Sequence, residues 1–363
     1  MGAHVGKGGG LGLQTFQLFN WLRQHIDVQL LCLDAPGVHR GLSDDPDVIL
    51  AGPLEFPKGI GYLRRSLRSL RDEYDAFQVL DPYYSLPAAC LADVFPRAIF
   101  FGADPIAEIG WRYGPLAAGV VRAMVPSLLA RGVLVVNSQS LAARFPKYAP
   151  RVIPNGVDFR VFDQLPERMD ARRLLGLPDG RPLLAFVGKV IPVKRVEWLL
   201  EVLRRLPDVN AVVVGGYTED HYGDAYYREL MQTYSDVRDR LTFAGEVVWD
   251  RVPDYLAAAD VFVFPSKFEG QPNAVLEAMA AGLPVVASDI PAHRELIRHG
   301  ETGFLASDPA SMSRFVSDLM RDAGLRHRMG SEGRAYVREH LSTQASAAGY
   351  LELYRSMVQP RVD

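Results

Sequence analysis

The fold is decided by the stretch VFVFPSKFEGQPNAVLEAMAAGLPVVAS, residues 261–288. It begins with a short, continuously apolar run, which is typical of a strand covered on both faces. Pro272 suits the first position of a helix, because the N–H that proline lacks would stay unpaired there. Gly282 caps this helix, and Pro284 prevents its continuation. A second apolar run follows, so the stretch predicts a strand, a loop at residues 267–271, a helix and a second strand.

The same alternation runs through the rest of the chain. Short runs rich in valine, leucine and phenylalanine are separated by segments with an amphipathic helical pattern. Such runs suit parallel strands, and the segments between them suit crossover helices. Further strands are expected at residues 28–33, 77–80, 98–101, 133–136, 183–188, 211–216 and 241–245. The fold class is therefore α/β, with doubly wound parallel sheets.

The length of the chain predicts two domains. A chain of 363 residues exceeds what one hydrophobic core usually organises. The strands pause at residues 163–182, where prolines, glycines and charged residues suit a linker and a short helix. We therefore expect one Rossmann-like domain over residues 1–167 and a second over residues 168–343. The final segment, residues 344–363, begins with a helical pattern.

Charge and cysteine content exclude several classes of protein. The 40 basic and 43 acidic side chains leave a net charge of −3, whereas a generic nucleic-acid-binding protein is usually basic. Cys32 and Cys90 each lie in an apolar run, where buried thiols are favoured over a disulfide. No secretory-leader pattern or membrane-spanning apolar stretch is evident. We expect a cytoplasmic protein.

The loop before the helix at Pro272 has the features of an anion site. Open parallel sheets bind ligands at the carboxyl ends of their strands. A helix N-terminus placed there offers unpaired N–H groups and a partial positive charge, which together favour phosphate. Gly270 lets the backbone approach such an anion closely. The sequence therefore predicts a phosphate-binding site at the start of this helix.

Two glutamates flank the predicted phosphate site. Glu277 lies about 7 Å along the helix from its start, where a carboxylate suits the two hydroxyls of a ribose. Glu269, on the loop, faces whatever is attached beyond the phosphates. The alternative is that Glu269 is solvated and Glu277 lies on the surface. The apolar and small neighbours of Glu277 disfavour that alternative, because burying an unpaired carboxylate is costly.

A second candidate anion site follows the strand expected at residues 183–188. Gly188 turns the chain there, and Lys189 and Lys194 lie on the same proline-containing loop. Two ammonium groups can neutralise a diphosphate leaving group without a metal ion. Lysines on loops are more often solvated surface charges. Their position at the end of a strand favours the functional interpretation here.

Three other motifs are less specific. The glycines at residues 6–12 do not match G-x-G-x-x-G, but Gly10 and Gly12 in a loop that opens a helix can contact a phosphate or a sugar. The D-x-D spacing at residues 45–47 occurs in metal-dependent sugar transfer, but its polar loop disfavours a metal site. The basic pattern at residues 62–74 indicates a crossover helix, with a surface that contacts anionic lipid as the alternative.

With these motifs in place, the chain resembles the retaining glycosyltransferases of family 4, which have the GT-B fold. EGQPNAVLEAMAAGLPVVAS is similar to the E-x7-E signature of that family, and HRELIRHGETGFLA continues the match. VGKVIPVK resembles its segment for the donor diphosphate, with Lys189 in place of the usual arginine. VIPNGVDFRVF, from residue 152, resembles the interdomain segment, and GGGLGLQTF resembles the first glycine loop.

The resemblance implies a role for each candidate residue. Glu269 would contact the transferred sugar and Glu277 the ribose, while the loop around Val247 would contact the base. The resemblance also implies that two Rossmann-like domains face each other across a cleft and that residues 344–363 cross back onto the first. Many relatives carry a histidine after the strand at residues 98–101, where this chain offers Asp104 instead. Phosphate and sugar hydroxyls would be bound by the segment Gly270, Gln271, Pro272, Asn273, Ala274 and Val275.

The function expected from this resemblance is hexosyl transfer. A nucleoside diphosphate sugar of the UDP or GDP type would donate a sugar to a hydroxyl acceptor, with retention of configuration and without a metal or other cofactor. The first domain would bind the acceptor and the second the donor. A nucleotide-sugar epimerase, a phosphorylase, a nicotinamide dehydrogenase and a non-catalytic sugar-nucleotide-binding protein are the alternatives. Peripheral contact with the inner membrane face would involve residues 62–74.

Overall fold

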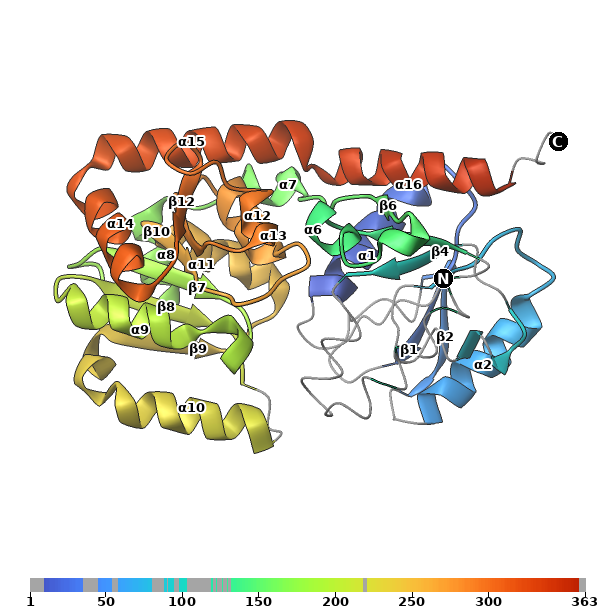
Figure 1. Cartoon of the computed structure of the whole chain (residues 1–363), viewed down its shortest axis with the longest axis horizontal. Coiled ribbons are helices and arrows are strands. Elements are labelled where there is room, and N and C mark those ends of the chain that lie inside the picture. The colour runs from blue at the N-terminus through green and yellow to red at the C-terminus, as the bar shows by residue number, and fades with distance from the viewer. Residues whose placement is uncertain are drawn as a thin grey trace. The chain divides into compact units, whose positions relative to one another are not determined.

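A computed structural model describes most of the chain (Figure 1). The described residues are 10–34, 45–53, 58–79, 88–89, 91–94, 98–102, 119, 122, 126, 129, 132–217 and 221–358. They form two compact units, one comprising residues 1–156 and 343–363 and the other residues 157–342.

The second unit is built on a six-stranded, fully parallel sheet with the order β12-β11-β10-β7-β8-β9. Its strands are β7 Leu183–Val187, β8 Asn210–Val214, β9 Leu241–Gly245, β10 Val261–Phe264, β11 Val285–Ser288 and β12 Gly303–Ala306. The winding starts at the centre of the sheet, proceeds to one edge through β8 and β9, and then proceeds to the other edge through β10, β11 and β12. This order is that of a doubly wound dinucleotide-type sheet.

Helices connect these strands and close the core of the second unit. They are α7 Phe159–Phe162, α8 Arg168–Leu175, α9 Val196–Arg205, α10 His221–Thr233, α11 Val252–Ala258, α12 Asn273–Ala280, α13 Pro291–Arg294, α14 Pro309–Arg321 and α15 Ala323–His340. The strand residues Leu184, Phe186, Phe262 and Val286 are fully buried. Continuously apolar strands are covered on both faces, as the sequence pattern predicted.

The first unit contains parallel strands in the orders β1-β2 and β3-β4-β5-β6. These strands are β1 Leu30–Asp34, β2 Val48–Pro53, β3 Gln78–Val79, β4 Ala98–Phe101, β5 Val133–Val136 and β6 Arg151–Val152. The described helices are α1 Gly10–Leu22, α2 Lys58–Leu70, α6 Gln139–Ala142 and α16 Thr343–Val358. Cys32 is a buried thiol in β1, whereas Cys90 lies outside the described residues.

Every strand that the apolar runs predicted is present, but three further strands of the described residues were missed. The missed strands are β2, β6 and β12. β6 is only two residues long and includes an arginine, and β12 begins with a glycine that follows a turn. A search for continuously apolar runs cannot find β6, because it is too short and carries a charge. β2 and β12 do contain short apolar runs, at residues 48–51 and 304–306, which the sequence analysis did not select.

Helix α16 belongs to the first unit and packs against α1, as the blue and red helices in Figure 1 show. Phe19 and Leu22 of α1 share a buried cluster with Ala347 and Tyr350 of α16. The hydroxyl of Tyr354 also donates a hydrogen bond to Gln78 of β3. The last helix of the chain is therefore part of the core that contains the first.

The boundary between the units lies after residue 156, whereas the sequence placed it after residue 167. The physical reason is that residues 157–167 carry apolar side chains into the core of the second unit. Phe159 and Phe162 are buried there. The amide of Val157 also donates to the carbonyl of Leu341 over 2.8 Å. Because the sequence analysis located the linker by its polar composition alone, it placed the boundary too far along the chain.

Helix α2 buries Leu63 and Leu67, as expected of a crossover helix. Arg64 and Arg68 donate to the carbonyl of Leu91 over 3.0 and 3.3 Å. These contacts do not test the alternative interpretation, so contact between residues 62–74 and anionic lipid stays a prediction. Across the described ranges, no helix has both the length and the apolar character needed to cross a bilayer.

Two glycines of α15 differ in a way that tests the packing of α12 and α15. A Cβ at Gly330 would lie 2.0 Å from the carbonyl oxygen of Gly282, whereas a Cβ at Gly333 would lie 3.4 Å from its nearest neighbour, a carbonyl oxygen. We expect Gly330→Ala to lower the free energy of unfolding in urea by about 1–3 kcal/mol, because backbone must move. Gly333→Ala should leave it unchanged or raise it by up to about 1 kcal/mol through helix propensity. Equal changes in the two variants would contradict this packing.

Candidate functional site

The winding of the second unit reverses between β7 and β10. The chain leaves β7 toward β8 and leaves β10 toward β11, so the two connections run to opposite edges of the sheet. Ligands of open α/β sheets bind outside the carboxyl ends of two such strands. The loops that follow these two strands, residues 188–195 and 265–272, carry three of the residues that sequence analysis selected as catalytic.

Hydrogen bonds join these two loops. The amide of Lys267 donates to the carbonyl of Val193 over 2.7 Å, and the hydroxyl of Ser266 donates to the same carbonyl over 3.2 Å. The guanidinium of Arg195 donates to the carbonyl of Ser266 over 3.1 Å. Ser288, at the end of β11, donates to that carbonyl as well. The loops after β7, β10 and β11 are thus held together as one structure.

Lys194 and Glu269 form an ion pair across the two loops. The Nζ atom of Lys194 lies 2.5 Å from Oε1 of Glu269, and the side chains are only 20% and 12% exposed. The same Nζ lies 5.2 Å from the ring centroid of Phe264, a distance at which a cation is attracted to the ring face. The structure therefore brings together two of the predicted catalytic residues, with the cation and the carboxylate in direct contact.

Lys189 and Gly188 lie at the start of the β7 loop. The Lys189 side chain is exposed and makes no hydrogen bond or ion pair with any described residue. Gly188 has a φ of +154°, and a Cβ at Gly215 would lie 2.0 Å from the Gly188 carbonyl oxygen. The loop therefore depends on the close approach of two backbone segments. Convergence of Lys189 and Lys194 on one anion stays a prediction.

Helix α12 begins one residue later than the sequence predicted. Pro272 is the N-cap, with φ −77° and ψ 101°, and Asn273 is the first helical residue. The carbonyl of Pro272 accepts hydrogen bonds from the amides of Val275 and Leu276 over 3.1 and 3.3 Å. The N-cap side chain makes no capping hydrogen bond within the described residues, so the helix start remains suited to an external hydrogen-bond acceptor. Gly270 and Gln271, before the cap, are buried.

Glu277 is a buried carboxylate on α12. It is 6% exposed, and its Oε1 accepts a hydrogen bond of 2.9 Å from Nε1 of Trp249. Burial raises the pKa of Glu277 to about 7, and the bond from Trp249 opposes that rise. Trp249 lies in the 3-10 turn Trp249–Arg251. Val247 lies shortly before this turn, and its partly buried side chain packs against the core. The surface alternative for Glu277 is therefore wrong.

His293 of α13 is a residue that sequence reasoning missed. It is fully buried, and its Nδ1 lies 2.7 Å from the carbonyl oxygen of Ser288, so Nδ1 carries the proton. Burial lowers the pKa of His293 to about 4, and the charges of Glu269, Lys194 and Arg195 act on it as well. Its Nε2 has no hydrogen-bond partner among the described residues. A single histidine among charged residues gives no sequence signal of this kind.

The other candidate residues lie in the first unit. Gly10 and Gly12 are in the first turn of α1, and Asp104 lies outside the described residues. The carboxylates of Asp45 and Asp47 each lie 2.5 Å from the guanidinium of Arg23. This pairing accounts for the D-x-D spacing. Within the described ranges, no group of three His, Cys, Asp or Glu side chains could hold a metal ion.

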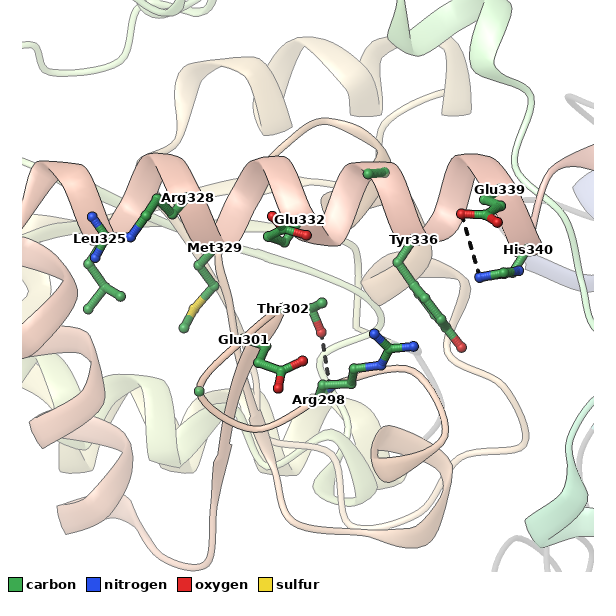
Figure 2. A pocket seen from close by; sticks show the side chains of 12 residues that line it. Arg298, Glu301, Thr302, Leu325, Arg328, Met329, Glu332, Tyr336, Glu339 and His340 are labelled. Carbon is green, nitrogen blue, oxygen red and sulfur yellow. Dashed lines mark hydrogen bonds and ion pairs between the residues drawn. The ribbon is translucent and has the colours of Figure 1, made fainter.

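A separate cavity of about 540 Å³ lies between α15 and the turn before β12 (Figure 2). Its lining carries both charges, including Arg298 and Glu301 from the turn and Glu332 from α15. The guanidinium of Arg298 lies 5.1 Å from the ring centroid of Tyr336. None of the candidate site residues lines this cavity. It is therefore distinct from the loops after β7 and β10.

Comparison with known proteins identifies the family. Residues 181–322 match the model of the family "Glycosyl transferases group 1". The chain is 31% identical over 277 residues to the GDP-mannose-dependent alpha-(1-6)-phosphatidylinositol monomannoside mannosyltransferase of Mycobacterium tuberculosis (strain ATCC 25618 / H37Rv). That alignment covers 69% of each chain. The chain belongs to the group 1 glycosyltransferases.

Other relatives of this glycosyltransferase support the same assignment. It is 28% identical over 287 residues to the lipopolysaccharide core biosynthesis mannosyltransferase LpsB of Rhizobium meliloti (strain 1021), covering 76% of this chain and 77% of the relative. The structure matches that of Anabaena HepE in complex with UDP and glucose with a TM-score of 0.81 and 20% identity, covering 98% of this chain and all of the other. The fold is therefore GT-B, as predicted.

Burial of the charged Glu277 carboxylate should destabilise the folded glycosyltransferase. The pKa of Glu277 is higher in the folded protein than in the unfolded chain, so protonation favours folding and this contribution is lost as pH rises through about 7. We expect Glu277→Gln to raise the free energy of unfolding at pH 8 by at most about 3 kcal/mol, and by less at pH 5. Urea unfolding at both pH values measures this. A gain that does not grow with pH would contradict the assigned burial.

Proposed function

We propose that this glycosyltransferase transfers a sugar from a nucleoside diphosphate sugar of the UDP or GDP type to a hydroxyl acceptor, with retention of configuration and without a metal ion, as in glycosyltransferase family 4. The observation that carries the proposal is the contact between Lys194 and Glu269 where the winding reverses. Lys194 lies on the loop after β7, and Glu269 lies on the loop that leads into α12. Glu277 is buried on that helix.

The relatives support a sugar nucleotide as donor. The mycobacterial relative is named as GDP-mannose-dependent, and HepE is described in complex with UDP-glucose in one of its structures. The named relatives include enzymes of lipopolysaccharide core and phosphatidylinositol mannoside synthesis. We infer that the acceptor is a hydroxyl of a glycan, glycolipid or glycoside, and that the second unit binds the donor.

The charges of the site suit stabilisation of a leaving diphosphate. Negative charge grows on the bridging oxygen as the bond to the sugar breaks, and fixed positive groups stabilise that charge. Lys194 is held by Glu269 and by the ring of Phe264, so its ammonium needs little reorganisation to meet a phosphate. Lys189 and the uncapped start of α12 would add to the same field.

Glu269 would then contact the transferred sugar. Its carboxylate can accept hydrogen bonds from sugar hydroxyls while it orients Lys194. In the retaining reaction, the departing phosphate oxygen would assist removal of the acceptor proton on the same face of the sugar. The loops that follow β7, β10 and β11 would position these groups, because direct hydrogen bonds join them.

The proposed function is tested with a panel of UDP-, GDP- and ADP-sugars, starting with mannosyl and glucosyl donors. Release of nucleoside diphosphate with an extract as the acceptor source, unchanged by a chelator, is expected. NMR of the product should show the same anomeric configuration as the donor. Turnover without acceptor or dependence on added phosphate would indicate an epimerase or a phosphorylase instead. Folded protein that binds and turns over no member of the panel would overturn the proposal.

Removal of the Glu269 carboxylate separates chemistry from binding. We expect Glu269→Ala to lower kcat at least about a hundredfold, because the sugar and Lys194 both lose their partner in the transition state. The Kd for nucleoside diphosphate should change by less than about threefold, since the released Lys194 still meets phosphate. Glu301→Ala, which removes an exposed acid from the same unit, is the control and should change neither quantity. Equal loss of turnover and nucleotide affinity in Glu269→Ala would contradict this role.

A further inference from the structure

The buried carboxylate of Glu277 has little support from the protein around it. The residues that follow it on α12, Ala278, Met279 and Ala280, are buried and apolar. The strands β10 and β11 pack against this helix, and their buried residues are uncharged. The buried residues of α15, which also contacts α12, are Met329, Gly330, Gly333 and Val337. A carboxylate in such surroundings is unfavourable unless hydrogen bonds satisfy it.

Among the described residues, Trp249 supplies the hydrogen bond that Glu277 receives. Its indole Nε1 donates to Oε1 over 2.9 Å, and Oε2 has no partner within the described part of the chain. An indole N–H can only donate, so this bond favours a carboxylate oxygen as its partner. One oxygen is thus occupied by the protein and the other is available to a ligand.

The indole is itself held in place by the fold. Trp249 begins a 3-10 turn between β9 and α11, and its ring packs against the core of the second unit. Two charged residues follow it in the same turn, Asp250 and Arg251. The guanidinium of Arg251 lies 2.9 Å from Asp254 of α11, so its charge is compensated there. The side chain that orients Glu277 is therefore a large and rigid donor on a fixed turn.

We propose that Trp249 is a positioning residue that fixes the rotamer and the charge of Glu277 for a ribose diol, and so determines the preference for ribonucleotide over 2′-deoxyribonucleotide donors. This inference rests on the proposed function. With Oε1 held by the indole, Oε2 and the remaining lone pair of Oε1 receive the two ribose hydroxyls. A ligand that lacks one hydroxyl leaves part of this buried carboxylate unpaired, and sites built to bind a hydroxyl discriminate strongly against such a ligand.

The charge of Glu277 depends on the same hydrogen bond. Burial raises the pKa of this carboxyl to about 7, and donation from Trp249 opposes the rise. Within the described part of the chain, no charged side chain is among the causes of that shift, so loss of the indole N–H would raise the pKa further. Because the acid is charged above its pKa, ribose binding strengthens as pH rises. The midpoint of this dependence moves to higher pH without the indole.

The test compares Trp249→Phe, which keeps a ring but removes the N–H, with the unmodified enzyme. Titration calorimetry with UDP, dUDP, GDP and dGDP gives the Kd values between pH 6 and 9. We expect the affinity of Trp249→Phe for the preferred ribonucleotide to fall about tenfold at pH 7. The ratio of ribonucleotide to deoxyribonucleotide affinity should fall toward 1, and the pH midpoint should rise. Trp21→Phe, in the first unit, is the matched control and should change none of these.

A double-mutant cycle separates action through Glu277 from direct contact with the nucleotide. In a Glu277→Gln background, Trp249→Phe should change the Kd by less than about twofold. An equal loss in both backgrounds would show that Trp249 contacts the nucleotide itself, and would overturn the inference. An unchanged affinity ratio in Trp249→Phe would overturn it too.

Folding and the proposed function are controlled separately. Trp249→His keeps an N–H donor on a smaller ring, and it should recover part of the affinity ratio if Trp249→Phe is too unstable to titrate. Failure of Trp249→His to retain any preference for ribonucleotides would count against the inference. Failure of the unmodified enzyme to bind any nucleoside diphosphate would instead overturn the proposed function on which the inference rests.

Discussion

The candidate site of this glycosyltransferase is centred on the ion pair between Lys194 and Glu269, which joins the loops after two neighbouring strands. The strand order brings the carboxyl ends of β7 and β10 together. A backbone hydrogen bond from the amide of Lys267 to the carbonyl of Val193 then fixes the separation of the loops. The two side chains are both largely buried, and buried opposite charges stabilise each other only in good geometry. A ligand that carries both a phosphate and sugar hydroxyls can use both side chains, because the phosphate would pair with the ammonium and the hydroxyls would donate to the carboxylate.

The fold could be predicted from the sequence because the strands of parallel sheets are buried on both faces. Runs such as those of β7, β10 and β11 are continuously apolar for this reason, and they alternate with amphipathic segments. The boundary between the units could not be placed in the same way. Phe159 and Phe162 come just before the stretch of linker composition, on the first-domain side of the predicted boundary, yet they fill the core of the second unit.

The candidate site could be predicted only in part. Lys194, Glu269 and Glu277 lie where strand ends and a helix start suggest them, and a motif links them. Trp249 and His293 could not be found, because their significance depends on which distant side chains they meet. The indole donates to a carboxylate 28 residues later in the chain, and the buried histidine packs against the ring of Phe264 on β10. No local pattern records such contacts.

We propose that Lys194 binds the diphosphate of the donor. This is measured by titration of UDP and GDP into the unmodified enzyme and into Lys194→Ala, each at two salt concentrations. Arg181→Ala, which removes an exposed charge from the same unit, serves as the reference. We expect Lys194→Ala to weaken nucleoside diphosphate binding at least about tenfold and to reduce its salt dependence, while nucleoside binding and the Arg181→Ala variant stay unchanged. Nucleoside diphosphate affinity in Lys194→Ala equal to that of the unmodified enzyme would show that Lys194 does not bind the diphosphate.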